Sequence, residues 1–404
     1  MNARPPLTPM RGSNHSGMRQ FNERTVLQAI RHHGAIPKAE LARLTQLTSQ
    51  TVSIIVGRLL DEGLLIKQDR VRGRIGQPSV PLSLNPAGAF SVGVQVGRRN
   101  LEVLVSDFCG RPVHRHEVLY AYPDPDQLMG QVQDGLQRMQ AAMGAQWSRV
   151  VGVGLTSPLS LHKWADMLGG RAAQAMARWE HLDLRAQVQG LTDLPVVFAK
   201  DTVSACVAEL LQGHGRLVPN FLYVFVGTFI GGALVLGGHL QAGDRGNAGA
   251  IGSMPVGLAP SGAGMPAQLL QVASGWQLEQ ALMAAGHDAL LVHHEQIMDP
   301  AHAACTEPWL AQASSALAMT VASASALLDL DAVVVDGSLG APLMQALMRR
   351  TGDALADYRF DGMRRPQLLV GEVGRHARAL GASLLPLHAQ FFPDKDIILK
   401  QETL

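Results

Sequence analysis

A run of short polar side chains near residue 50 has the types and spacing needed to recognise duplex DNA. Hydroxyl and amide groups of this length can reach base edges or phosphate oxygens from one end of a helix. Basic residues that follow would add phosphate or minor-groove contacts. The candidate DNA-contacting residues are Thr48, Ser49, Gln50, Thr51, Ser53, Arg58, Arg70, Arg72 and Arg74.

These side chains are carried by Ile36–Leu65, a segment that predicts two helices joined by a tight turn. Pro37 suits the first turn of a helix, where its missing N–H would be unpaired anyway. Gln46 and Leu47 form the turn, and Thr48 is the expected N-cap of the second helix. The apolar face of that helix has spacings of three and four and comprises Val52, Ile55, Val56, Leu59 and Leu60.

The flanking segments complete a winged helix-turn-helix. A helix is expected at Arg24–His32, before the pair, and Leu64 and Ile66 indicate a strand after it. A basic, glycine-hinged segment then predicts a wing that touches the DNA backbone, while the third helix enters the major groove. Its residues are Lys67, Arg70, Arg72, Gly73, Arg74 and Gly76. The simpler alternative is an ordinary helical hairpin with a polar outer face.

The charge distribution agrees with a DNA-binding head. The whole chain of 404 residues has a net charge of only +1. Residues 1–86 contain 12 Lys and Arg against 5 Asp and Glu, whereas the remainder contains 22 against 28. A basic head on an acidic body fits a protein of which only the head meets nucleic acid.

Composition excludes several other classes of protein. A hydrophobic fraction of 47% with 17% charged residues is typical of a soluble globular protein. Cys109, Cys206 and Cys305 are too far apart to indicate a disulfide framework or a zinc ribbon, so we expect reduced thiols in a cytoplasmic protein. No run of about 18 apolar residues indicates a membrane span, and the first 20 residues do not have the pattern of a secretion signal.

The chain divides into five parts. We expect a disordered tail at 1–20, the winged helix-turn-helix at 21–86, two α/β lobes at 87–200 and 201–392, and a C-terminal tail at 393–404. In the first lobe, alternating apolar residues predict an antiparallel meander followed by helix, strand, helix and strand, as in a ribonuclease H-like fold. The expected elements there are strands 90–96, 101–105, 112–119, 150–155 and 195–198 and helix 127–143.

The second lobe repeats this theme. The expected elements are helices 202–211, 267–284, 309–328 and 375–387 and strands 221–226, 232–236, 332–335 and 367–370. The predicted fold class is therefore α/β, with an N-terminal winged helix-turn-helix and a two-lobed body. Two such lobes with a cleft between them form the architecture of actin-like ATPases and sugar kinases.

Four segments in order resemble the ROK family (repressor, open reading frame, kinase), in its branch with an N-terminal winged helix. The strongest match is Gly227–Val256, which resembles the family's phosphate loop and signature. Asp336–Gly340 sits where the family has its adenosine-side glycines, and Val151–Pro158 and Leu194–Leu210 fall in the expected order. A glycine loop alone is a weak signal, but the ordered set is strong. The resemblance covers about residues 20–390.

Departures from the family pattern decide between kinase and regulator. The family's kinases hold Mg²⁺ and ATP with an Asp where this chain has Gln95, and a neutral amide is a poor ligand for a hard cation. The family's Asn-Asp pair, which binds sugar and supplies the general base, reads Lys200-Asp201 here. The family's signature Glu and His fall at Ala250 and Ser253.

Two further differences concern the sugar and metal sites. A further sugar-binding Glu of the family corresponds to Leu270, and residues 258–268 lack the family's zinc-binding cysteines. The resemblance therefore implies a degenerate kinase body with no catalytic residues, no cofactor and no metal. His293, His294 and Glu295 could suggest a metal site, but neighbouring residues on a helix point apart, which favours a solvated face.

The effector pocket that the resemblance implies would be less charged and more apolar than that of a hexose kinase. Candidate effector-binding residues are Thr156, Lys200 and Asp201, although structural hydrogen bonds or ion pairs would explain them equally well. Three alternatives stay open: a modified or different ligand, a ligand held by other residues, or no small effector.

The sequence therefore predicts a cytoplasmic DNA-binding transcriptional regulator, with the resemblance favouring a repressor. We expect a double-stranded DNA operator as partner, no membrane partner, and a homodimer or homotetramer whose heads read paired half-sites. The competing predictions are a sugar kinase with an appended DNA-binding head and a scaffold whose head binds a protein.

Overall fold

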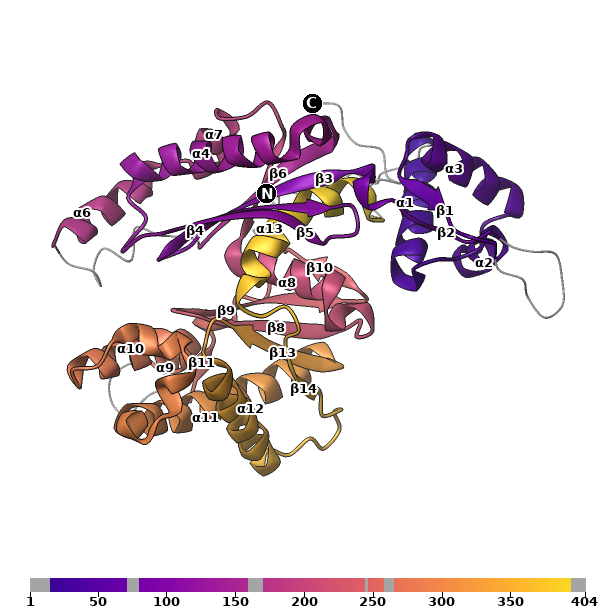
Figure 1. Ribbon diagram of the computed structural model, residues 1–404. Helices are drawn as coiled ribbons and strands as arrows, with labels where there is room; N and C mark the ends of the chain where they lie inside the picture. Colours follow the sequence, from indigo (N-terminus) through magenta and orange to yellow (C-terminus); the bar gives the residue numbers. More distant parts are fainter. Residues whose placement is uncertain (1–14, 71–79, 159–169, 244–245, 258–264, 394–404) are drawn as a thin grey trace, which may run out of the picture.

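The computed structural model describes residues 15–70, 80–158, 170–243, 246–257 and 265–393. They form a head and a two-lobed body (Figure 1). The mixed α/β class and the winged head predicted from the sequence are both confirmed. The basic loop residues Arg72 and Arg74 lie outside the described residues.

The head has three helices and a two-stranded hairpin: α1 (His15–His33), α2 (Lys38–Thr45), α3 (Ser49–Asp61), β1 (Leu65–Lys67) and β2 (Leu82–Leu84). The two strands are antiparallel. The predicted first helix was too short, because α1 begins at His15, inside the segment expected to be a disordered tail. Residues 15–25 contain few apolar residues, so the sequence shows no clear helical periodicity before Val26.

The first lobe is a five-stranded sheet in the order β5-β4-β3-β6-β7. Its strands are β3 (Phe90–Val96), β4 (Asn100–Asp107), β5 (Pro112–Leu119), β6 (Val150–Ser157) and β7 (Val196–Lys200). As the alternation predicted, β3, β4 and β5 are antiparallel neighbours, while β6 and β7 are parallel to β3. The long helix α4 (Pro125–Met143) packs on β4 and β5.

The helix expected between strands 150–155 and 195–198, for which the sequence indicated no bounds, is present as two short helices, α6 (Gly170–Ala177) and α7 (Leu184–Gln189).

The second lobe has a sheet in the order β10-β9-β8-β13-β14. Its strands are β8 (Phe221–Val226), β9 (Ile230–Leu236), β10 (His239–Gln241), β13 (Ala332–Gly337) and β14 (Gln367–Val370), beside a separate hairpin of β11 (Pro255–Val256) and β12 (Ala267–Gln268). Its helices are α9 (Leu269–Ala273), α10 (Gly275–Ala284), α11 (Ala303–Leu328) and α12 (Ala341–Ala354). The single helix expected over 267–284 is wrong, because Ser274 has an extended backbone that separates α9 from α10.

Two helices lie between the sheets, α8 (Asp201–Gln212) and α13 (Ala377–Phe391) (Figure 1). They pack against each other, and α13 also covers β3 and β6 of the first sheet. Gly93, Gly154 and Gly381 permit these close approaches, because a Cβ at any of them would lie less than 2.5 Å from a backbone atom of the neighbouring element. The expected boundary between the lobes at residue 200 therefore does not account for α13. This helix follows the second lobe in sequence but packs on the sheet of the first lobe.

The stretch Pro300–Leu328, which contains α11, is long and apolar enough to cross a membrane by length and composition, but 61% of its most apolar window is buried inside the protein. Its apolar side chains pack in the core of the second lobe, including Trp309, Leu310 and Leu317. We interpret α11 as a core helix.

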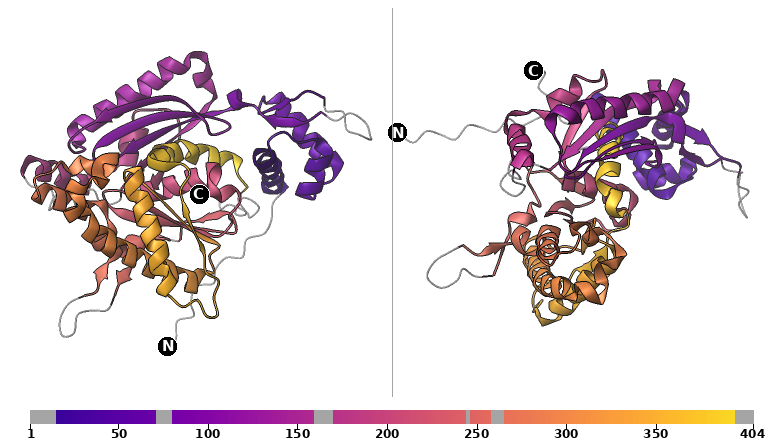
Figure 2. Two further views of the ribbon diagram at one scale, coloured as in Figure 1. Left: turned by 60° about the horizontal axis from the view of Figure 1, so that its bottom comes forward. Right: turned by 60° about the vertical axis from the view of Figure 1, so that its left-hand side comes forward.

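The head packs on the body through α1, which contacts α13 (Figure 1 and the left view of Figure 2). The Arg31 guanidinium donates from Nη1 to the Phe108 carbonyl at 2.9 Å and lies over the rings of Phe108 and Phe392. Arg24 donates to the Phe392 carbonyl at 3.1 Å. One apolar cluster runs from the head into the body, and it includes Ile30 and Leu384.

Candidate functional site

Helix α3 has the construction expected of a recognition helix. The Thr48 hydroxyl accepts the Thr51 N–H at 3.1 Å, so the predicted N-cap is confirmed. Gln46, in the preceding turn, has a φ of 56°, which places it in the left-handed region. One face of α3 is buried in the head core, through Val52, Ile55, Val56 and Leu59.

The opposite face of α3 is open to solvent. Ser49, Gln50 and Ser53 are exposed, as the prediction requires. The sequence reasoning did not single out Ile54, whose side chain is 68% exposed beside them. An apolar residue on the polar side of an amphipathic helix was the available signal. Apolar side chains at such positions can contact the thymine methyl group in the major groove.

Of the four arginines predicted to contact DNA, the two that the structure describes differ in their surroundings. The Arg58 guanidinium pairs with Glu23 of α1 and lies 3.5 Å from Glu62, so it holds the helices of the head together. Arg70 is exposed at the base of the hairpin loop. Arg72 and Arg74 lie outside the described residues.

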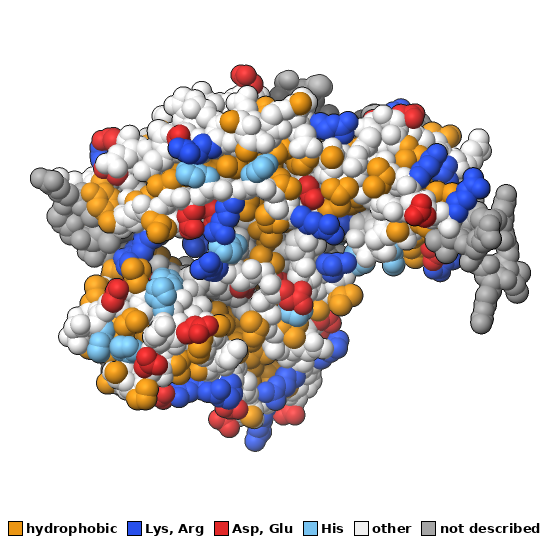
Figure 3. Space-filling model, in the orientation of Figure 1, with side chains coloured by type: hydrophobic (Ala, Val, Ile, Leu, Met, Phe, Trp, Pro, Cys, Tyr) orange, Lys and Arg blue, Asp and Glu red, His pale blue; other side chains and the backbone are white. Residues whose placement is uncertain are grey.

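A cleft separates the two lobes of the body and contains a cavity of about 640 Å³. Basic side chains gather around this hollow (Figure 3). Arg98 and Arg99 line it from the β3–β4 turn, and Arg375, His376 and Arg378 line it from the short turn before α13 and the first residues of that helix. Its floor includes the Asp336–Gly340 segment.

The two arginines of the β3–β4 turn also form an ion-pair cluster that joins the lobes. Glu279 of α10 is fully buried, and its Oε2 accepts from Arg98 at 2.9 Å and from Arg99 at 3.1 Å. Arg98 also lies over the Trp276 ring at 4.9 Å. Burial lowers the pKa of Arg98, and the neighbouring Glu279 carboxylate opposes that shift. Sequence reasoning missed this cluster, since its members are about 180 residues apart.

The structure shows the surroundings of Gln95, Asp201 and Asp336, three residues at or near positions that the family's kinases use. Gln95 is 1% exposed, pairs in register with Thr156 across β3 and β6, and its Nε2 has no hydrogen-bond partner in the described part of the chain. The Asp201 carboxylate lies 3.9 Å from the Arg378 guanidinium and accepts the Thr202 N–H at 2.8 Å. Asp336 is buried, and its carboxylate accepts the Tyr223 hydroxyl and two backbone N–H groups.

The three candidate effector residues lie at the ends of two parallel strands. Thr156 is near the end of β6, Lys200 ends β7, and Asp201 begins α8. The strands are neighbours, and the Thr156 hydroxyl donates to the Ala199 carbonyl at 2.9 Å. Ligands of α/β folds commonly bind outside such strand ends. The geometry thus brings the three residues together, and it also supplies Thr156 with a structural partner.

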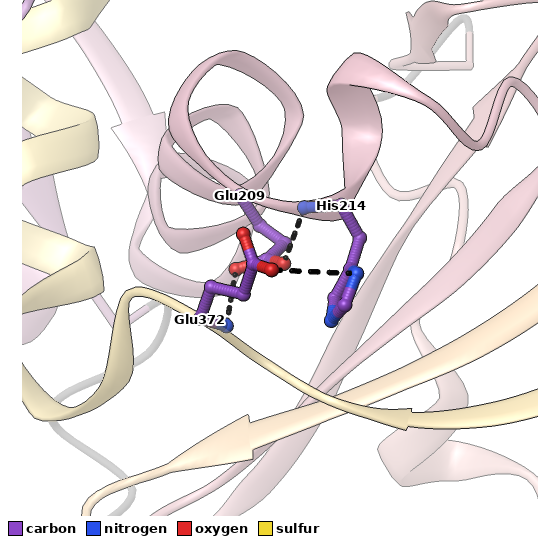
Figure 4. A group of neighbouring side chains, drawn as sticks. All are labelled: Glu209, His214 and Glu372. Atoms are coloured by element: carbon purple, nitrogen blue, oxygen red, sulfur yellow. Dashed lines mark hydrogen bonds and ion pairs between the residues drawn. The ribbon is translucent and has the colours of Figure 1, made fainter.

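Glu209, His214 and Glu372 offer ligand atoms within 4.8 Å of one another (Figure 4). Their contacts explain them without a metal, because the Glu209 carboxylate accepts the backbone N–H of His214 at 2.9 Å and that of Glu372 at 3.1 Å. His214 Nε2 lies 2.9 Å from the Val370 carbonyl oxygen. The group ties the end of α8 to the segment after β14.

His293 and its neighbours do not converge. His293 Nδ1 lies 2.6 Å from the Ser338 carbonyl oxygen, and burial lowers the pKa of its imidazole. His294 and Glu295 are exposed. The three cysteines are free thiols, and Cys206 and Cys305 are buried.

Comparison with known proteins identifies both parts of the chain. A model of the ROK family matches residues 91–389. A model of the MarR family matches residues 20–75, which correspond to the head.

Two relatives illustrate the range of similarity. The chain is 26% identical over 373 residues to an uncharacterized protein of Sinorhizobium fredii, covering 92% of each chain. It is 24% identical over 244 residues to the xylose repressor of Bacillus subtilis, covering 59% of this chain and 61% of that one. The chain thus matches less than two thirds of the length of the xylose repressor.

Solved structures share the fold. A ROK family transcriptional regulator, described as a homologue of the E. coli MLC protein, is 21% identical with a TM-score of 0.69, covering 93% of this chain and 98% of that one. A ROK family glucokinase from Streptomyces griseus, in complex with glucose and AMPPNP, is 21% identical with a TM-score of 0.55, covering 74% of this chain and 99% of that one. With its family model matching three quarters of its length, this chain belongs to the ROK family.

Proposed function

We propose that the chain is a DNA-binding transcriptional regulator that acts as a repressor. The single observation that carries this proposal is the exposed polar face of α3, held by a capped helix-turn-helix beside an antiparallel hairpin. Ser49, Gln50 and Ser53 would face the major groove, with Thr48 and Thr51 at its edge. The basic charge of residues 1–86 and the likeness to named repressors support it.

The same reasoning assigns the basic residues. Arg70, Arg72 and Arg74 would contact phosphates or the minor groove from the wing. Arg58 would contribute only if DNA drew it away from Glu23 and Glu62, with which it pairs here.

The regulator would act as a homodimer or homotetramer in the cytoplasm. A single winged helix presents one recognition helix, and operators are commonly read as two half-sites about one helical turn apart. Two heads on one symmetric assembly would meet this requirement. A ligand in the body would then change the spacing of the heads and, with it, the affinity for the operator.

We propose a sugar or sugar derivative as the effector, held near Thr156, Lys200 and Asp201. Their position at the ends of β6 and β7 supports this assignment, as does the relatives' name of xylose repressor. Ala250, Ser253 and Leu270 replace charged or imidazole groups of the family's kinases, so fewer polar side chains are available to pair with hydroxyl groups.

We propose further that the body does not transfer phosphoryl groups. Gln95 supplies no carboxylate for Mg²⁺, Asp201 is paired with Arg378, and the ion-pair cluster at Glu279 joins the lobes beside the cleft. Glucokinase is the second candidate function, because a ROK glucokinase shares the fold. A coupled ATPase assay with a panel of hexoses tests it, and turnover with any hexose would overturn the regulator-only proposal.

Capture of genomic DNA fragments by the full chain tests the primary proposal. We expect a small set of fragments to be enriched, with affinity that falls as salt rises. If no fragment is retained at low salt, the head would be assigned to a protein partner instead.

A further inference from the structure

A small cavity lies where the head meets the body. Its volume is about 260 Å³, below the usual range for drug-sized ligands, so it suits a compact molecule. Its walls come from α1 of the head, the segment after α8, the start of β10 and the end of α13. The polar side chains around it are Gln28, Arg31, His32, Arg216, His239 and His388.

The charge of this junction cavity is one-sided. Two of these side chains are arginines and three are histidines, and the described lining contains no carboxylate. The Asp107 carboxylate acts on Arg31 from outside this lining, and its Oδ1 already accepts the N–H groups of Cys109 and Arg111. A cavity with this charge concentrates anions.

Two buried polar atoms at the junction cavity are unpaired. Arg31 Nη1 donates to the Phe108 carbonyl, but its Nη2 is buried and finds no acceptor among the described residues. Gln28 Oε1 is also buried and has no donor within the described ranges. Unpaired buried groups of this kind are uncommon and costly. An occupant with an anionic oxygen and a hydroxyl group would match the donor on Arg31 and the acceptor on Gln28.

We propose that the junction cavity binds a compact phosphate, either inorganic phosphate or a small phosphate monoester. A phosphoryl oxygen would accept from the Arg31 guanidinium, and a P–OH or alcohol O–H would donate to the Gln28 side-chain carbonyl, since both side chains line the cavity. Arg216 and His239, which are exposed at the mouth, would pair with the remaining charge. This site is separate from the interlobe cleft, which is lined by other residues.

An occupant of the junction cavity would touch both head and body. Gln28 and Arg31 belong to the head, whereas Arg216 and His239 belong to the second lobe. The bound anion would therefore favour the packed orientation of the head. This consequence for DNA binding rests on the proposed function, whereas the binding site itself does not.

Isothermal titration calorimetry of the full chain tests the site, with inorganic phosphate, glycerol phosphate and glycerol as separate titrants at constant ionic strength. Arg31 is left unchanged because it also joins the head to the body. The test variant is R216Q/H239Q. The control variant is R349Q/H181Q, which removes the same two side-chain types from exposed positions elsewhere.

We expect saturable binding of one phosphate per chain, none of glycerol, and at least tenfold weaker binding by R216Q/H239Q but not by R349Q/H181Q. The relative affinities for the two phosphates identify which of them is the better ligand. No binding to the unaltered chain, or equal binding by R216Q/H239Q, would overturn the proposal. Retention of genomic DNA with and without phosphate is measured in parallel, so that loss of DNA binding alone would count against the proposed function and not against this site.

Discussion

Replacing Glu279 with Gln tests the role of the ion-pair cluster between the lobes. The change keeps the size of the side chain and removes its charge, leaving Arg98 and Arg99 without their shared carboxylate. Removal of one partner from a buried ion pair typically costs about 3–5 kcal/mol, because the remaining charge is desolvated and unpaired.

The exposure of the two arginines indicates that the cost of Glu279→Gln lies near the lower end of that range. The Arg98 side chain is only 10% exposed, but that of Arg99 is 33% exposed and can regain water. We therefore expect a loss of about 3 kcal/mol in the free energy of unfolding. The glutamine carbonyl can still accept one hydrogen bond, which also limits the loss.

Urea unfolding followed by circular dichroism measures the effect as a lower midpoint with an unchanged slope. Glu307→Gln is the matched control, since Glu307 pairs with Arg350 at 2.6 Å but its side chain is 51% exposed. Exposed pairs contribute little, about 0–1 kcal/mol. If Glu279→Gln lowered the midpoint no more than Glu307→Gln does, the cluster would not hold the lobes together.

Three further predictions concern the head. Thr48→Ala should lower the stability of the head by about 1 kcal/mol, because the N-cap of α3 is lost. Thermal unfolding measures this change, with Thr45→Ala as the control for a threonine inside a helix. An equal effect of both substitutions would argue against capping. Ile54→Ala should leave stability nearly unchanged, because the side chain is exposed, but weaken operator binding about tenfold. Fluorescence anisotropy with a captured DNA fragment measures the affinity. Unaltered affinity would exclude Ile54 from the interface. R72Q/R74Q should reduce the magnitude of the slope of log binding constant against log salt concentration by about 1.8, since each phosphate contact contributes about 0.9. An unchanged slope would refute the wing assignment.

The sequence predicted best those features that depend on local periodicity. The spacing from Val52 to Leu60 defined α3, and the threonine before it identified the cap. Alternation predicted β3 to β5 and their antiparallel order, because tight turns leave sequential strands adjacent. The ordered glycine segments predicted the family of the body, whose match covers residues 91–389.

Features that depend on distant contacts were not predicted. The pairing of Arg98 with Glu279 and the return of α13 to the first sheet involve residues far apart in sequence. The helical start of α1 at His15 has few apolar residues to indicate it. Ser274 gave no strong breaking signal between α9 and α10, where an extended backbone interrupts the expected helix. The assignment of Arg58 to DNA overlooked Glu23, which competes for it across the head.

Binding of genomic DNA by the unaltered chain and by Q50A/S53A tests the central claim most directly. Both side chains are exposed on α3 and neither contributes to the buried face of the helix, so the variant should fold normally. We predict that the unaltered chain enriches discrete fragments and that Q50A/S53A loses this selectivity while keeping weak, salt-sensitive binding. Enrichment of the same fragments to the same extent by both proteins would contradict recognition through this helix.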